Sequence, residues 1–187
     1  MKLELAIIET PELEVGSKGP EFTLQGTDGK EHSLASFDSR FLVIIFMSNG
    51  CPTVRAYEDR LMGLQRDYRT KSVRLVGINS NNEHLSAIDS FEEMVRRARE
   101  SGFTFPYLKD SGGSVAKAYG AVCTPHVFVL DGERRVRYRG RIDDARHESR
   151  VTSTDLRNAL DDLLGERPEM GTVRVAATEP FGCSIVW

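Results

Sequence analysis

Two nearly unbroken apolar runs predict strands in the middle of a sheet. They are residues 41–47 and residues 73–78, and runs of this kind are typical of strands that are covered on both faces. Between them, from Pro52 onward, apolar residues recur at steps of three and four, as on one face of a helix: Val54, Tyr57, Leu61, Leu64 and Tyr68. The pattern therefore predicts a strand–helix–strand unit.

Two β-hairpins are predicted on either side of this unit. The first joins residues 22–24 to residues 32–34, and the Asp28-Gly29 pair between them supplies the positive φ of a tight turn. The second joins residues 127–130 to residues 136–142 through a turn at another Asp-Gly pair. Both hairpins add antiparallel strands to the predicted sheet.

Three further helices are predicted from apolar spacing and from the glycines that follow them. They cover residues 91–101, 115–119 and 156–164, and each is followed by a glycine. Ser90 and Glu93 have the spacing of a capping box at the start of the first of these helices. We therefore expect helices both within and after the strand-rich part of the chain.

Helices placed between buried strands indicate an α/β fold, with a central mixed sheet flanked by helices and an N-terminal β-hairpin extension. The length of 187 residues suits one domain. We assign residues 1–165 to this domain, with an irregular or edge-strand lead-in over residues 1–19. Residues 166–187 form a C-terminal tail that we expect to pack on the same domain.

The composition narrows the classes of function. The net charge is −3 and no long block of one sign occurs, which argues against a nucleic-acid or membrane-surface binder. No apolar run is long enough to cross a bilayer and no secretory signal is recognisable, so we expect a cytoplasmic protein. The three cysteines, Cys51, Cys123 and Cys183, should then be mainly reduced thiols, and their odd number leaves one free of any intrachain pairing.

The sequence pattern predicts a reactive thiol at Cys51. It lies between a predicted buried strand and the N-terminus of a predicted helix, where backbone N–H groups and the helix dipole stabilise an anion. Such a position lowers the pKa of a thiol below its free value of about 8.5, and Arg55 can add a cation one turn further on. The alternative is a buried, unreactive cysteine, but the polar turn over residues 49–52 favours a reactive thiol.

Cys123 and Cys183 are the candidates for a second, resolving thiol. Cys123 stands just before Thr124-Pro125, at the start of a predicted strand. Alternate residues of an extended segment face opposite ways, so if Thr124 faces Cys51, Cys123 faces away. Cys183 lies in the tail, which is free in principle to fold across the site. We favour Cys183 as the resolving thiol and keep Cys123 as the less favoured candidate.

Two further groups of polar side chains have a functional and a structural interpretation. Cys123 and His126 have a Cys-x-x-His spacing, which could make a soft-metal site together with Cys51, but no second closely spaced ligand accompanies Cys51. Asp143 and Asp144 are interpreted as a solvated charge cluster at a hairpin end. No glycine-rich phosphate loop follows a strand. We predict neither a metal nor a cofactor.

Several short motifs, taken in their order along the chain, resemble the thioredoxin-like superfamily. The strand–Cys-Pro–helix unit, Asp110, Thr124-Pro125 and the hairpins carry the general resemblance, and residues 19–24 resemble the opening of its alkyl hydroperoxide reductase/thiol-specific antioxidant (redoxin) branch. Five segments resemble, more narrowly, a subgroup of thiol:disulfide interchange proteins: residues 49–52, 56–61, 78–81, 139–144 and 182–185. The resemblance spans nearly the whole chain.

This resemblance implies a thioredoxin-like fold and a thiol-dependent oxidoreductase. It also implies a cis bond at Thr124-Pro125, which places that loop opposite Cys51 to hold an extended thiol partner, with Pro52 and Arg55 as further binding residues. The implied substrates are protein disulfides, low-molecular-weight disulfides or hydroperoxides, and the external reductant is left open. The competing class is a non-enzymatic module of this fold that binds a soft metal or a protein partner.

The chain departs from the family pattern at two places. Thioredoxins have a Cys-x-x-Cys motif, but Val54 stands at the position of the second cysteine, so that a local disulfide cannot form. Peroxiredoxins place Pro and Thr upstream of the reactive cysteine, where this chain has Ile44 or Ile45 and Ser48. An oxidised Cys51 must therefore be resolved by a distant cysteine or by an external thiol.

Overall fold

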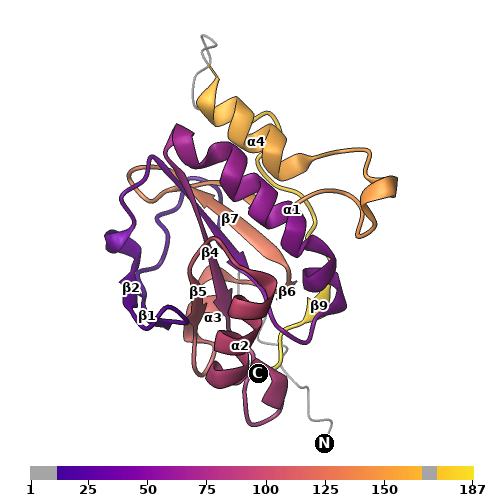
Figure 1. The fold of residues 1–187 in the computed structure, drawn as a ribbon. Helices are drawn as coiled ribbons and strands as arrows, with labels where there is room; N and C mark the ends of the chain where they lie inside the picture. The colour runs from indigo at the N-terminus through magenta and orange to yellow at the C-terminus, as the bar shows by residue number, and fades with distance from the viewer. Residues whose placement is uncertain (1–11, 166–171) are drawn as a thin grey trace, which may run out of the picture.

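The computed structural model describes residues 12–165 and 172–187, and a mixed β-sheet forms its centre (Figure 1). Within these residues seven strands join in the order β2-β1-β5-β4-β3-β7-β8. In chain order they are β1 (Thr23–Gly26), β2 (Glu31–Ser33), β3 (Phe41–Phe46), β4 (Val73–Asn79), β5 (Tyr107–Lys109), β7 (His126–Leu130) and β8 (Val136–Gly140). A separate two-stranded ladder pairs β6 (Cys123–Thr124) with β9 (Cys183–Ser184).

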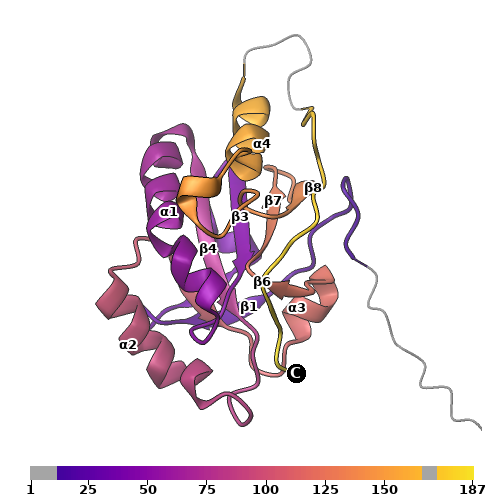
Figure 2. The same ribbon diagram turned by 90° about the vertical axis from the view of Figure 1, so that its right-hand side faces the viewer.

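Helices cover both faces of the sheet (Figure 2). The α-helices are α1 (Pro52–Tyr68), α2 (Phe91–Ser101), α3 (Ser114–Tyr119) and α4 (Asp155–Leu164). Short 3-10 helices are Leu34–Ser36, Arg69–Lys71, Ala87–Asp89 and Glu148–Arg150. Helices α1 and α4 bury their apolar stripes on one face together with Met94 of α2, whereas α3 packs on the other face beside the N-terminal hairpin. The predicted fold class is confirmed.

Strand β3 is the centre of the sheet, as its apolar run predicts. It pairs in parallel with β4 and antiparallel with β7, which makes the sheet mixed. Val43 and Ile45 face the α1 side, and Leu42, Ile44 and Phe46 face the α3 side. None of the five side chains is more than 1% exposed. Burial on both faces explains why the run has no polar alternation.

Turn and cap residues act largely as the sequence indicates. Gly29 has φ +79° in the β1–β2 turn, and Ser90 caps α2 because its hydroxyl accepts a hydrogen bond from the Glu93 N–H. The Glu93 carboxylate, however, pairs with Arg96. In the β7–β8 connection the residue with positive φ is Arg134, at +61°, which lies two positions beyond the Asp-Gly pair. The hairpin turn is therefore longer than a tight two-residue turn.

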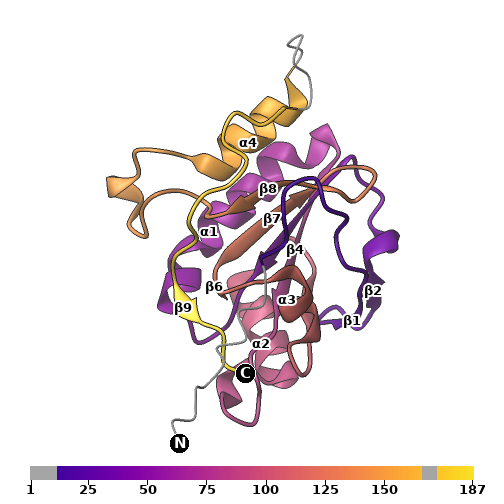
Figure 3. The same cartoon turned by 180° about the vertical axis from the view of Figure 1, so that it is seen from behind.

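The last residues return to the sheet and end beside β6. Residue Ala177 forms a parallel bridge with Arg139 of β8, and β9 then pairs antiparallel with β6. Figure 3 shows this path, with β9 in yellow running alongside β6. At the other end, Lys18 forms an isolated bridge with Arg135, whereas residues 1–11 of the predicted lead-in lie outside the described residues. Within the described residues no helix is long and apolar enough to span a membrane.

Candidate active site around Cys51

Cys51 caps the N-terminus of α1, directly after β3 and its following turn. Its side chain accepts a hydrogen bond from the Val54 N–H, with 3.5 Å between Val54 N and Cys51 Sγ. Pro52 occupies the first helical position, where a missing N–H leaves no hydrogen bond unmade. The thiol is only 2% exposed. The local sequence thus holds a buried sulfur at the positive end of a 17-residue helix.

The loop before β7 lies opposite this sulfur. Cys51 Sγ donates a hydrogen bond to the Thr124 carbonyl oxygen at 3.1 Å. The Thr124-Pro125 peptide bond is cis, as the resemblance implied. Thr124 is buried, and its hydroxyl lies 3.4 Å from the Ser48 hydroxyl at the end of β3. The structure therefore brings together three of the residues named from the sequence: Cys51, Thr124 and Pro125.

The third face of the site is supplied by the C-terminal tail. In the β6–β9 ladder Thr124 is directly opposite Cys183, and the Cys51 and Cys183 thiols are near enough for each to shift the pKa of the other. Gly182 has φ +155°, and a Cβ at this position would overlap the Thr124 carbonyl group. Only glycine lets the tail backbone approach β6 this closely. Cys183 is consequently held beside Cys51.

The hydrogen bonds around Cys51 favour its thiolate. Burial raises the pKa of the Cys51 thiol, but hydrogen bonds from the Cys183 thiol, the Val54 N–H and the Thr124 hydroxyl outweigh the burial. The pKa of Cys51 therefore lies below its ordinary value. For Cys183, burial and the neighbouring Cys51 raise the pKa above its ordinary value, although Thr53 donates hydrogen bonds that act the other way. The two neighbouring thiols thus differ in acidity, with Cys51 the more acidic.

Cys123 occupies a different environment from the other two thiols. It is buried, and its Sγ lies 3.7 Å from the Pro125 carbonyl oxygen. Burial, and then the negative charge that Cys51 and Cys183 can carry, raise the pKa of Cys123 to about 12. Its thiolate is therefore scarce at neutral pH. All three cysteines are free thiols in the structure.

Arg55 supports the turn before Cys51. Its Nε donates to the Asn49 carbonyl oxygen at 2.8 Å, and the groups that most lower the pKa of Cys51 are hydrogen-bond donors at the thiol itself. The guanidinium is exposed beside the site. In this structure Arg55 thus stabilises the backbone of the turn before Cys51, and a role in substrate binding stays a prediction.

A buried polar network that the sequence analysis did not predict supports the turn before Cys51. Its centre is Asp89, which is 0% exposed and accepts a hydrogen bond from the Asn49 N–H at 2.7 Å. The amides of Asn79 and Asn81 and the Ser86 hydroxyl also donate to its carboxylate. Burial raises the pKa of Asp89, but these donors outweigh it and the pKa lies below its ordinary value. The asparagines after β4 hinted at the network, but nothing local in the sequence marks Asp89 as their common acceptor.

The proposed soft-metal cluster does not form among the described residues, which contain no group of three or more metal-ligating side chains. The His126 ring is fully buried, and its Nδ1 accepts from the Val122 N–H at 3.3 Å. Its Nε2 lies 3.4 Å from Glu12 Oε1. His126 thus faces the N-terminal lead-in rather than a shared site with Cys51.

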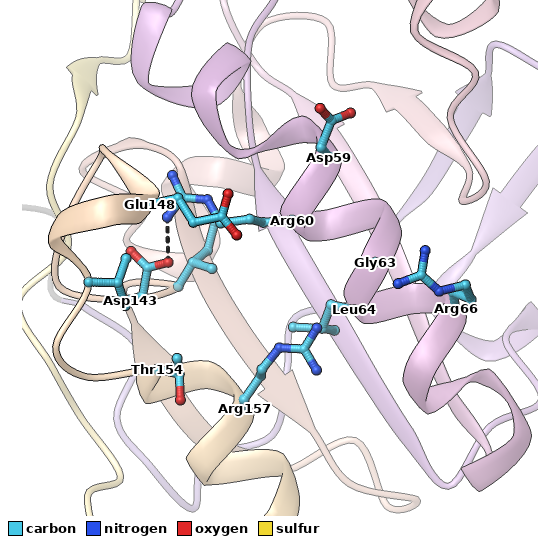
Figure 4. A pocket seen from close by; sticks show the side chains of 11 residues that line it. Asp59, Arg60, Gly63, Leu64, Arg66, Asp143, Glu148, Thr154 and Arg157 are labelled. Atoms are coloured by element: carbon cyan, nitrogen blue, oxygen red, sulfur yellow. Dashed lines mark hydrogen bonds and ion pairs between the residues drawn. The ribbon is translucent and has the colours of Figure 1, made fainter.

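A pocket of about 300 Å³ lies apart from the cysteines, between α1, α4 and the segment that joins β8 to α4 (Figure 4). Asp143 and Arg60 line it and form an ion pair of 2.6 Å. Asp143 is only 4% exposed and also accepts a hydrogen bond from the Tyr57 hydroxyl. The interpretation of Asp143 as part of a solvated cluster is therefore wrong. It is a buried anchor that ties this segment to α1.

A cysteine at the start of the helix that follows a central strand, opposite a cis-proline loop, defines a thiol-redox protein of the thioredoxin-like class. The chain belongs to the Redoxin family, whose family model matches residues 14–160. The match covers the sheet, helices α1 to α3, most of α4, Cys51 and Cys123, but ends before Cys183.

Named relatives agree with this assignment. The chain is 26% identical to the thiol-disulfide oxidoreductase ResA of Geobacillus thermodenitrificans over 66% of its own length and 67% of the relative's. It is 30% identical to a Mycobacterium tuberculosis protein described as a candidate peroxiredoxin, over 60% of this chain and 68% of that one. The protein is therefore an oxidoreductase of the thiol-disulfide oxidoreductase or peroxiredoxin type.

A solved structure matches more of the chain than the family model does. A hypothetical protein of Sinorhizobium meliloti superposes with a TM-score of 0.86 at 37% identity, over 95% of this chain and 96% of that one. The likeness thus extends beyond the part of the chain that the family model matches.

Proposed function

We propose that the protein is a two-cysteine thiol oxidoreductase in which Cys51 is the nucleophile and Cys183 the resolving thiol. Its electron acceptor is a hydroperoxide or a disulfide. The observation that carries this proposal is the ladder between β6 and β9, because it sets Cys183 opposite Thr124, the residue whose carbonyl oxygen accepts a hydrogen bond from the Cys51 thiol. This arrangement replaces the second cysteine that Val54 removes from the helix.

With a hydroperoxide, the Cys51 thiolate attacks one oxygen of the O–O bond. That bond breaks, the second oxygen leaves as an alcohol or water after it takes up a proton, and Cys51 becomes a sulfenic acid. The Cys183 thiol then attacks the Cys51 sulfur, water leaves, and a Cys51–Cys183 disulfide forms. With a disulfide substrate, the first product is a mixed disulfide on Cys51, and attack by Cys183 releases the second substrate thiol.

Two external thiol groups close the cycle, and the first of them attacks this disulfide. Cys183 is the more exposed of the two sulfurs, since Cys51 is only 2% exposed. Cys51 is also the better leaving group, because its pKa is lowered and that of Cys183 is raised. One thiol of the reductant therefore attacks Cys183, and Cys51 leaves as the thiolate. A second reductant thiol then attacks the mixed disulfide and releases Cys183. A cytoplasmic location belongs to this proposal, because a reducing compartment supplies such thiols.

The test is to map the product of a single oxidation. The reduced protein receives one equivalent of hydrogen peroxide, free thiols are then alkylated under denaturing conditions, and peptides are analysed by mass spectrometry without reduction. The expected product is a Cys51–Cys183 bridge with Cys123 alkylated, and Cys123→Ser should behave in the same way. Cys183→Ser should stop at a sulfenic acid on Cys51. A Cys51–Cys123 bridge overturns the role of Cys183. A Cys51 that stays reduced here and also with a small disulfide such as oxidised glutathione overturns the role of Cys51.

A further inference from the structure

The backbone edge next to Cys51 is already occupied by the protein's own tail. Strand β6 contains Thr124, whose carbonyl contacts the Cys51 thiol, and its ladder partner within the described residues is β9. The pairing joins Cys123 to Ser184 and Thr124 to Cys183. An extended peptide that brought its own cysteine to Cys51 along this edge would need the same backbone groups.

The tail is anchored at the residues that follow Cys183 as well as at Cys183 itself. The Val186 N–H donates to Asn81 Oδ1 at 2.9 Å, and the Val186 carbonyl accepts from the Asn82 N–H at 2.7 Å. Ile185 is 6% exposed and belongs to the apolar cluster on the α3 face of the sheet. The Trp187 ring lies against Gly113, where an added Cβ would collide with it.

Successive residues of the tail are anchored in alternate ways: Ile185 and Trp187 by apolar side-chain packing, and Val186 by backbone hydrogen bonds. The side chains of an added strand alternate in the same way. The tail thus imitates a bound peptide: a glycine that clears the Thr124 carbonyl, a cysteine at the reactive sulfur, and an aliphatic side chain in the core two residues later.

We propose that residues 182–187 form a strap over Cys51. The strap restricts Cys51 to small oxidants and excludes the disulfide bonds of other proteins. This inference rests on the proposed function and names its substrate class. A hydroperoxide or a small disulfide needs only a local displacement of the Cys183 side chain. A protein disulfide arrives with its flanking backbone, which needs the edge of β6 that the strap holds.

The strap is tested with a full-length variant that loses both apolar anchors, Ile185→Ala together with Trp187→Ala. Val175→Ala is the matched control, because Val175 lies earlier in the same tail and is 56% exposed. A second variant ends after Cys183, which removes the anchors but keeps the resolving thiol. Circular dichroism confirms that each variant retains the wild-type fold.

Two substrates are compared with dithiothreitol as the reductant: hydrogen peroxide, and insulin as the protein disulfide. In insulin reduction the Cys51 thiolate attacks one S–S bond and expels an insulin thiolate. Cys183 then attacks Cys51 and expels the second thiolate, and dithiothreitol reduces the new bridge. Wild type and Val175→Ala should reduce insulin at the rate of dithiothreitol alone, and both strap variants should reduce it about tenfold faster, since they expose the β6 edge. Peroxide consumption should change by less than about threefold.

The outcomes distinguish failure of the strap proposal from failure of the proposed two-cysteine function. If wild type forms the Cys51–Cys183 bridge with peroxide but reduces insulin as fast as the strap variants, the strap is wrong and the two-cysteine cycle stands. If the strap variants gain no insulin reduction while they still consume peroxide, the strap is also wrong. If Cys51 reacts with neither substrate in any variant, the proposed function fails as well.

Discussion

Replacement of Gly182 by alanine should loosen the tail while it leaves the sheet intact. The new Cβ would overlap the backbone of Thr124, which no side-chain rotation can relieve, and φ at this position is +155°. A non-glycine residue in such a region costs about 1–3 kcal/mol. Because the obstacle is backbone, the tail segment must move away from β6 to remove the overlap.

The strength of the anchors sets the size of the effect. Two hydrogen bonds hold Val186, at about 0.5–1.5 kcal/mol each. Ile185 is buried, which contributes about 1.5–3 kcal/mol. The anchors thus amount to roughly 2.5–6 kcal/mol. A loss of about 1–3 kcal/mol lowers the ratio of docked to released tail by about 5- to 150-fold.

Amide hydrogen exchange measures this ratio directly. In Gly182→Ala the Val186 and Asn82 amides should exchange about 5- to 150-fold faster than in wild type, whereas the amides of β3 should keep their protection. Gly16→Ala is the control, since Gly16 also has a positive φ, of +91°, but an added Cβ there meets nothing within 4 Å. Unchanged exchange at Val186, or an equal loss of protection in β3, would refute the reasoning.

Three further results are expected. Iodoacetamide at neutral pH should label Cys51 first. The thiolate fraction at a given pH rises as the pKa falls, and the pKa is lowered for Cys51 and raised to about 12 for Cys123; first labelling of Cys123 would contradict the assignment. Thr124→Val should shift the pH profile of Cys51 alkylation upward, because the Thr124 hydroxyl helps to lower that pKa; an unshifted profile would remove this role. Asp89→Asn should lower the free energy of unfolding in urea by about 2–3 kcal/mol, because a buried acceptor of several hydrogen bonds loses its charge; a loss no greater than that of the exposed Asp38→Asn would be inconsistent with the network.

Much of the fold could be predicted from local pattern alone. The apolar run of β3, the largely apolar run of β4 and the stripe of α1 follow directly from burial, because a strand covered on both faces has few polar positions and a helix covered on one face has a period of 3.6. Gly102, with φ +65°, ends α2 for a reason that the residue type itself supplies. The exact turn of the second hairpin could not be predicted in this way, because its geometry depends on loop length and on the contacts that hold Arg134.

Cys51, the cysteine that we propose as the nucleophile, could also be singled out from sequence, since it stands at a boundary between strand and helix that both neighbours reveal. Its surroundings could not. Cys183 meets Cys51 only because the tail crosses the molecule, and Asp89 supports the turn across 40 residues of chain. Contacts of such long separation leave no local periodicity. The sequence by itself determined which residues form strands and helices and which thiol sits at a helix end, whereas only the tertiary structure decided which distant residues share its hydrogen bonds and which thiol lies beside it.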